Sequence, residues 1–300
     1  MPRLETQPFG RTGHASSRVV FGAAALMAND PGVNDRVLAA LLEHGINHID
    51  VAAMYGKAED AVGTWMPEHR DSFFIASKTH QRDYAGARDQ IRRSLDRLRI
   101  DRLDLIQLHN LRAQEDRERV FSEDGALRAA VELRDEGLVR FIGVTGHGLS
   151  IPEAHLDSLE RFPFDSVLLP CSSLLLARDD YAPGFRRVVE TCRERGVAVQ
   201  TIKAVAQRRW RQGETPTRHS WYAPMEELDV LERAVHFVLA QPDVFLNTSS
   251  DLTTLERTLA AAARFDGTEP SREVLASDLA RVAATSLFEV GLEDPGQAPT

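Results

Sequence analysis

The stretch FFIASKTHQRDYAGARDQIRRSLDRLRIDRLDLIQLHN, residues 73–110, has two short aliphatic runs separated by a longer segment with helical periodicity. The runs Phe73–Ser77 and Leu103–Gln107 are typical of buried parallel strands because they show little polar alternation. Between them, Tyr84–Arg97 has apolar residues at the three- and four-residue spacing of a helix face. The stretch therefore predicts a strand, a helix and a second strand of one parallel sheet.

The same strand-then-helix unit recurs along the chain. The ranges predicted as strands are Arg18–Gly22, Ile46–Asp50, Phe73–Ser77, Leu103–Gln107, Val139–Gly143, Asp165–Leu169, Val197–Ile202 and Val244–Asn247. The ranges predicted as helices are Asp35–Glu43, Glu59–Trp65, Tyr84–Arg97, Gly125–Glu136, Ile151–Glu160, Tyr181–Arg195, Met225–Ala240 and Leu252–Arg264. Eight such units within about 250 residues predict an α/β protein with a (β/α)8 TIM barrel.

An open, doubly wound sheet is the alternative architecture. That fold usually carries a G-x-G-x-x-G turn after its first strand, whereas here the first strand leads into GAAA, residues 22–25. Upstream, Leu4–Gln7 and Ala15–Val19 flank a turn-like segment and predict a β-hairpin that closes the bottom of the barrel. We therefore interpret residues 1–300 as one barrel domain with a C-terminal tail, from about residue 268, that is ordered only in part.

The composition predicts a soluble, cytoplasmic protein that binds neither nucleic acid nor membranes. The chain has 36 Lys and Arg residues against 45 Asp and Glu residues, and its net charge is −9. An acidic chain is poorly suited to general binding of nucleic acid or anionic lipid. No apolar run approaches the roughly 18 residues of a membrane span, and two cysteines, Cys171 and Cys192, are too few for a disulfide scaffold. The oligomeric state stays open.

Four polar side chains follow three successive predicted strands. Asp50 ends the second strand and Tyr55 lies five residues later, while Lys78 follows the third strand and His109 the fourth. Taken singly, a residue of one of these types more often caps a helix, carries a surface charge or fills space between other side chains. Because a TIM barrel places its active site at the C-terminal ends of its strands, together they predict a catalytic centre.

The same residues carry a resemblance to a known family. The segments GINHIDVAAMYGKAEDAVG, residues 45–63, and SLDRLRIDRLDLIQLHN, residues 94–110, resemble two motifs of the aldo-keto reductase superfamily, although Val51 stands where the family usually has Thr. The resemblance extends from about residue 8 to residue 265. It matches the family's catalytic tetrad to Asp50, Tyr55, Lys78 and His109 and implies NAD(P)H-dependent reduction of an aldehyde or ketone to an alcohol.

Carbonyl reduction needs a proton as well as a hydride. We expect Tyr55 to donate the proton, with the ammonium of Lys78 lowering its pKa from the usual value of about 10. Asp50 would keep Lys78 charged, and His109 would hydrogen-bond the substrate oxygen. The hydride must come from a nicotinamide because no side chain can supply one.

The resemblance also implies a set of cofactor-binding positions. Thr145 and Gly146 belong to a G-x-T-G-H variant that a branch of the family shares. A helix N-terminus at Ser249 and Ser250 favours a phosphate. Basic residues after the seventh strand favour NADP(H), whereas Asp251 disfavours a 2′-phosphate and leaves NAD(H) possible. The predicted cofactor-binding residues are Gly22, Ala24, Asp50, Thr145, Gly146, Ile202, Lys203, Arg208, Arg209, Ser249, Ser250 and Thr258.

Two other functions stay open at this point. One is an NADP-binding redox sensor or regulatory subunit with little turnover, and the other is a lyase or isomerase that uses Lys78 as a Schiff-base amine. No metal site is predicted, because Gly45 should end the helix between His44 and His48. The substrate is a small carbonyl compound, and we expect the loops at residues 110–124 and 208–224 and the C-terminal tail to select it.

Overall fold

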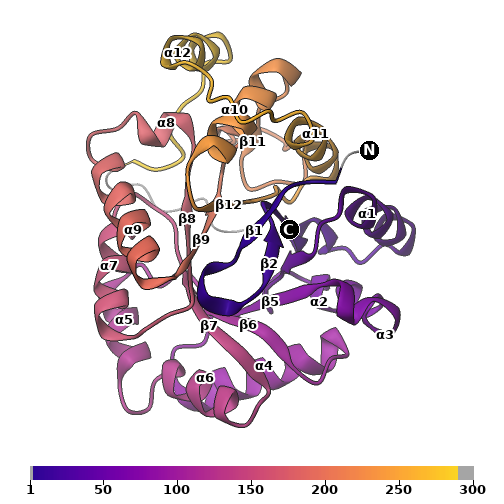
Figure 1. Ribbon diagram of the computed structural model, residues 1–300, viewed down its shortest axis with the longest axis vertical. Coiled ribbons are helices and arrows are strands. Elements are labelled where there is room, and N and C mark those ends of the chain that lie inside the picture. The colour runs from indigo at the N-terminus through magenta and orange to yellow at the C-terminus, as the bar shows by residue number, and fades with distance from the viewer. Residues whose placement is uncertain (1–2, 290–300) are drawn as a thin grey trace.

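The computed structural model, which describes residues 3–289, has a closed barrel of eight parallel strands at its centre (Figure 1). Around the barrel the strands follow the order β12-β3-β4-β5-β6-β7-β8-β9. Their bounds are β3 Val19–Gly22, β4 His48–Asp50, β5 Phe74–Thr79, β6 Leu103–Leu108, β7 Val139–Thr145, β8 Ser166–Pro170, β9 Ala198–Ile202 and β12 Val244–Asn247. Each strand overlaps one predicted range, so the prediction of a TIM barrel is confirmed.

Helices follow the strands and cover the outside of the barrel (Figure 1). The eight predicted helices are α1 Pro31–His44, α2 Ala58–Gly63, α4 Tyr84–Leu98, α6 Ala126–Asp135, α7 Ile151–Arg161, α9 Ala182–Arg195, α10 Leu228–Ala240 and α11 Leu252–Ala262. Shorter elements that the sequence pattern did not predict are α3 Met66–His69, α5 Gln114–Phe121, α8 Ser173–Leu176 and the antiparallel pair of β10 Ala206–Arg208 with β11 Ala223–Pro224. None of the described helices is long and apolar enough to cross a membrane.

Capping residues fix where several helices begin and end. Asp83 and Asp251 accept hydrogen bonds from backbone amides in the first turns of α4 and α11. Gly45 ends α1 in the left-handed conformation, with φ of 71°. His44 therefore lies in a helix and His48 in strand β4, so the two imidazoles do not share a helix face.

The predicted N-terminal hairpin is present and closes one end of the barrel. Strands β1 Thr6–Pro8 and β2 Ala15–Ser17 pair antiparallel, and in Figure 1 they lie over the centre of the barrel. Between them, Phe9 is fully buried, with ring centroids 5.5 Å from Phe74 and 5.0 Å from Phe245. Both partners stand near the N-terminal ends of their strands, so the hairpin covers the end opposite the predicted active site.

The segment after residue 268 packs on the barrel as far as residue 289. Helix α12, Arg272–Arg281, contacts α10 through Arg233, whose Nη2 donates to Asp278 Oδ1 at 2.8 Å. Farther on, Leu287 accepts a hydrogen bond from Arg209 Nε at 2.6 Å. The rest of the tail that we predicted to be partly ordered, residues 290–300, lies outside the described residues.

We expect Phe9→Ala to lower the free energy of unfolding by about 3–5 kcal/mol, because it leaves a cavity in the closed end of the barrel. Urea unfolding followed by circular dichroism measures the change. Leu228→Ala is the control, since Leu228 is 61% exposed and its truncation should cost less than about 0.5 kcal/mol. A similar small loss for Phe9→Ala would contradict the role of this ring as a plug.

Candidate active site

The four predicted catalytic residues meet at the mouth of the barrel, the end formed by the C-terminal ends of the strands. Asp50 is the last residue of β4, and Lys78 lies near the end of β5. His109 follows β6 directly, and Tyr55 lies in the loop after β4. Because β4, β5 and β6 are neighbours in the barrel, their ends bring these side chains together.

Asp50 is the centre of a buried hydrogen-bond network. Its Oδ2 accepts from Lys78 Nζ at 2.6 Å and from Asn247 Nδ2 at 3.1 Å, and its Oδ1 accepts from Gln107 Nε2 at 2.7 Å. Lys78 Nζ also donates to the carbonyl of Val51 at 2.9 Å. Since Asp50 is 4% exposed and Lys78 2% exposed, each charge depends on the other and on these polar neighbours.

The sequence analysis missed the polar residues that support Asp50. Gln107 comes from β6 and Asn247 from β12, and Gln200 on β9 donates to Gln107 Oε1 at 3.0 Å. All three are polar side chains inside otherwise apolar strands, and this is the signal that could have revealed them. They fill the barrel interior beneath the four predicted residues with hydrogen-bonded side chains.

Tyr55 lies among three other side chains at the mouth. Lys78 Nζ is 5.0 Å from the centroid of the Tyr55 ring. The rings of Tyr55 and His109 meet edge to face, with centroids 6.0 Å apart, and the Trp221 ring lies 5.9 Å from Tyr55 on a third side. His109 Nδ1 is buried and has no hydrogen-bond partner among the described residues, so it can still bond a ligand.

The protonation states follow from burial and neighbouring charges. Burial raises the pKa of Tyr55 above 10.0, and Lys78 opposes this change without reversing it. We had expected the ammonium to lower the tyrosine pKa, but in this site the loss of water outweighs the charge. Burial lowers the pKa of Lys78, yet Asp50 and Tyr55 more than offset it, so that pKa lies above 10.5. Burial and the charge on Lys78 hold the pKa of His109 well below 6.5.

Several predicted cofactor positions have structural contacts of their own. The amide of Gly22 donates to Thr248 Oγ1 at 3.0 Å, and a Cβ at Gly22 would lie 2.5 Å from the carbonyl oxygen of Thr248. Ala24 is buried in the turn after β3. At the end of β7, Thr145 Oγ1 accepts from the amide of Asn110 at 3.0 Å. A Cβ at Gly146 would lie 2.1 Å from Ile151 Cδ1, so this position has no room for a side chain.

The basic residues after β9 are mostly engaged by the protein itself. Arg208 pairs in a bidentate manner with Glu214, at 2.8 and 2.9 Å, and Arg209 bonds the carbonyl of Leu287. Lys203 follows Ile202 at the end of β9 with a left-handed φ of 71°. Burial lowers the pKa of Lys203 to about 8. The predicted cluster is therefore not a uniform patch of unpaired cations.

The N-terminus of α11 is covered by the segment at residues 218–222. Ser250 Oγ donates to the carbonyl of His219 at 2.9 Å, and the amide of His219 donates to Asp251 Oδ2 at 3.2 Å. Thr258 Oγ1 is buried without a hydrogen-bond partner in the described part of the chain, and Ser249 Oγ is buried beside the Tyr222 hydroxyl. The Thr258 hydroxyl can therefore still bond a ligand, but the covering segment would have to move to admit a phosphate.

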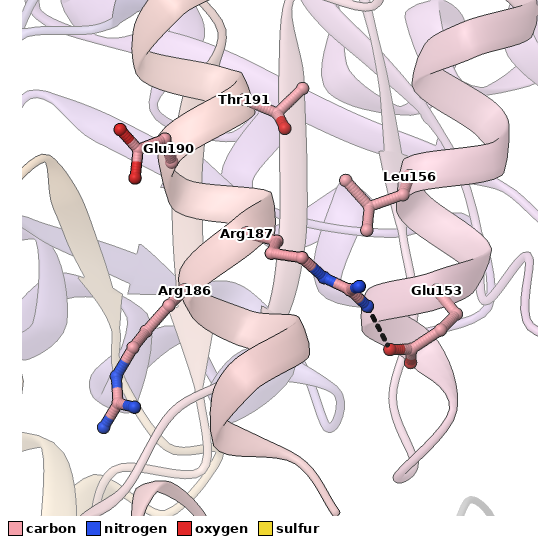
Figure 2. Close-up of a pocket in the computed structure, with 6 residues that line it drawn as sticks. All are labelled: Glu153, Leu156, Arg186, Arg187, Glu190 and Thr191. Carbon is pink, nitrogen blue, oxygen red and sulfur yellow. Dashed lines mark hydrogen bonds and ion pairs between the residues drawn. The ribbon is translucent and has the colours of Figure 1, made fainter.

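A groove on the outside of the barrel contains none of the predicted site residues. It lies between α7 and α9, and Figure 2 shows Arg187 directed toward Glu153, which it pairs with at 3.0 Å, while Arg186 points away from them. The lining residues are Glu153, Leu156, Arg186, Arg187, Glu190 and Thr191. The groove is formed by the outer surfaces of two helices and not by strand ends.

A sequence model of the Aldo/keto reductase family matches residues 18–268. The chain belongs to this family. It is 28% identical to the L-galactose dehydrogenase of Arabidopsis thaliana over 186 residues, which are 57% of each chain. It is 36% identical to an aldo-keto reductase of Mycobacterium avium over 149 residues, 48% of this chain and 50% of that one. The chain thus spans about half the length of these curated relatives.

Solved structures of aldo-keto reductases share the fold. One of them is the aldo-keto reductase from Klebsiella pneumoniae in complex with NADPH, which matches 93% of this chain and 95% of its own with a TM-score of 0.65. The sequence identity is 20%, so this likeness describes the barrel and not the site.

We expect Asp50→Asn to destabilise this aldo/keto reductase by about 3–5 kcal/mol, because it leaves the buried ammonium of Lys78 without its counter-charge. The double variant Asp50→Asn/Lys78→Met removes both charges and should recover part of that loss. Urea unfolding of wild type, both single variants and the double variant completes the thermodynamic cycle. A double variant no more stable than Asp50→Asn would contradict the coupling.

Proposed function

We propose that this aldo/keto reductase reduces an aldehyde or ketone to an alcohol with NAD(P)H as the hydride donor. The observation that carries the proposal is the convergence of Tyr55, Lys78 and His109 at the mouth, with Lys78 held by Asp50. A nicotinamide bound at the mouth would supply the hydride, since no side chain can. The reaction also needs a proton at the carbonyl oxygen, and residues of this chain would supply it.

Each of the four residues has a role that its environment supports. Tyr55 is protonated at neutral pH because burial raises its pKa, so it holds the proton that the carbonyl oxygen receives. As that proton leaves, the ammonium of Lys78 compensates the charge of the phenolate. Asp50 keeps Lys78 charged and in place. His109 is neutral, since its pKa is well lowered, and a neutral imidazole N–H can orient the substrate oxygen by a hydrogen bond.

The cofactor proposal favours NADP(H), with NAD(H) as the alternative. The buried hydroxyls of Ser249 and Thr258 suit a bound phosphate or adenine group. Asp251 Oδ1 accepts a hydrogen bond from the amide of Thr254 at 2.8 Å, so the carboxylate caps α11. A carboxylate held in this way repels a 2′-phosphate less than the position of Asp251 in the sequence suggested. Arg208 would first have to leave Glu214 in order to pair with a phosphate.

The other functions are less well supported by the geometry. A Schiff base requires a neutral amine, and Lys78 is a salt-bridged ammonium with a raised pKa. A redox sensor with little turnover would not require Tyr55 and His109 at hydrogen-bonding positions around one substrate site. We also propose a cytoplasmic location and no nucleic-acid partner, from the acidic charge and from the free, buried Cys171 and Cys192.

The test begins with fluorescence titration of NADPH and NADH, followed by turnover on a panel of aldehydes. We expect binding of at least one cofactor and its oxidation in the presence of an aldehyde. Tight binding without turnover on any aldehyde would support the sensor. The Schiff-base mechanism is tested by treating the enzyme with borohydride in the presence of substrate and measuring the intact mass. A stable adduct on Lys78 would favour that mechanism.

Tyr55→Phe should lower kcat by at least about 10²-fold, because it removes the proton donor and keeps the ring. The dissociation constant of NADPH should change by less than about two-fold, since the hydroxyl acts on the carbonyl. Steady-state kinetics on the best aldehyde and a fluorescence titration measure the two effects. Turnover close to that of wild type would assign the proton donor to another group.

The pH profile of kcat/KM for reduction of an uncharged aldehyde should stay flat from neutral pH to at least about pH 9. This rate constant reports the free enzyme, where the acid form of Tyr55 is active and its pKa lies above 10.0. Activity is therefore lost only as the pH rises through that higher value. Lys78→Met removes a charge that lowers the tyrosine pKa, so its alkaline limb should move further up. An alkaline limb near neutral pH in wild type would contradict this assignment.

A further inference from the structure

Two basic side chains at the mouth differ from their neighbours in how their charges are paired within the described residues. On the loops around the barrel mouth, Arg82 pairs with Asp116 and Arg208 with Glu214. Arg112 and Lys203 are both partly buried, yet neither forms an ion pair with a carboxylate of residues 3–289. A partly buried cation without a counter-charge costs free energy, so a site that keeps two of them is suited to receiving an anion.

Backbone contacts fix the position of Arg112. It follows β6 by four residues, and the loop is tied to the end of β7 because the amide of Leu111 donates to the carbonyl of Thr145 at 2.9 Å. The side chain lies against Gly148, where an added Cβ would be 3.1 Å from Arg112 Cδ and 3.2 Å from Nη1. Gly148 has a φ of 103°, which only glycine adopts easily, so the chain leaves this space for the guanidinium.

Lys203 is held by two aromatic rings at the mouth. Its Nζ is 4.9 Å from the centroid of the Tyr222 ring and 5.6 Å from that of Trp221, and Trp221 in turn contacts Tyr55. Aromatic faces hold an ammonium but do not neutralise its charge. Burial lowers the pKa of His147 to about 3, and the charges of Lys203 and Arg112 contribute to that change, so both cations act on the same ring.

We propose that Arg112 is the specificity residue of an anion subsite at the barrel mouth, which selects carbonyl substrates that carry a carboxylate, with Lys203 as its second positive charge. A guanidinium offers two parallel N–H donors to a carboxylate. Lys203 and Tyr55 both lie against the Trp221 ring, so a carboxylate bound at Lys203 would leave the carbonyl group of the same molecule near the proton donor. This inference rests on the proposed carbonyl reduction.

The place of Arg112 in the barrel argues for a substrate anion rather than a cofactor phosphate. Arg112 follows β6, and in the closed order of eight strands β6 stands opposite β12. The predicted phosphate positions, Ser249 and Ser250, follow β12. A group bound by Arg112 therefore lies across the mouth from the N-terminus of α11.

The experiment compares 4-carboxybenzaldehyde with 4-carbamoylbenzaldehyde, which have nearly the same shape and differ in charge. We expect wild type to show a kcat/KM at least about ten-fold higher for the carboxylate. Arg112→Gln should reduce that ratio by about ten-fold, with most of the change in KM for the carboxylate. Arg186→Gln is the matched control, because it removes one positive charge from the groove between α7 and α9 (Figure 2) and should leave the ratio unchanged.

Other results would overturn the subsite. These are equal use of both aldehydes by wild type, an equal effect of Arg112→Gln on both, or weaker NADPH binding by Arg112→Gln without a change in the ratio. If wild type reduces neither aldehyde, the proposed reduction of such carbonyls fails, but the subsite is still decided by binding. Quenching of tryptophan fluorescence by terephthalate, weakened in Arg112→Gln and absent with terephthalamide, would support it, and equal quenching by both compounds would refute it.

Discussion

The buried ion pair between Asp50 and Lys78 is the constraint on which the rest of this site depends. A carboxylate that is 4% exposed needs hydrogen-bond donors in place of water, and here Lys78, Gln107 and Asn247 supply them. These partners come from β5, β6 and β12, so the network requires the strand register of a closed barrel. The positions of Asp50 and Lys78 relative to each other therefore depend on closure of the barrel.

The ion pair also bears on the acidity of the neighbouring Tyr55 phenol. Burial makes the Tyr55 phenol less acidic in the free enzyme, which keeps its proton in place at neutral pH. In the proposed reduction, Lys78 stabilises Tyr55 most when the phenolate forms, because an ammonium attracts a full negative charge more strongly than a neutral ring 5.0 Å away. Such an interaction is stronger in the transition state than in the ground state, which is what catalysis requires.

The sequence predicted the strands and the tetrad because both depend on local patterns. Apolar runs mark buried strands, and a TIM barrel places strand-end residues such as Asp50 and Lys78 at one mouth. The partners of Asp50 were visible as polar residues within apolar strands, but their hydrogen bonds depend on register across strands far apart in sequence. The pairing of Arg208 with Glu214 and the cover that His219 forms over Ser250 depend on loop conformation, which no periodicity encodes.

Basic residues that are close in the sequence do not necessarily form an anion site in the fold. Arg208, Arg209 and Arg211 stand together in the sequence and suggest a phosphate site, yet Glu214, in the same loop, pairs with Arg208 and also accepts from the Arg211 amide. Arg112 and Lys203 are far apart in the sequence and indicate nothing as a pair. In the fold the charges of both contribute to lowering the pKa of His147, and neither residue pairs with a carboxylate among residues 3–289. Because each paired arginine is largely neutralised, unpaired cations determine the positive potential at the mouth.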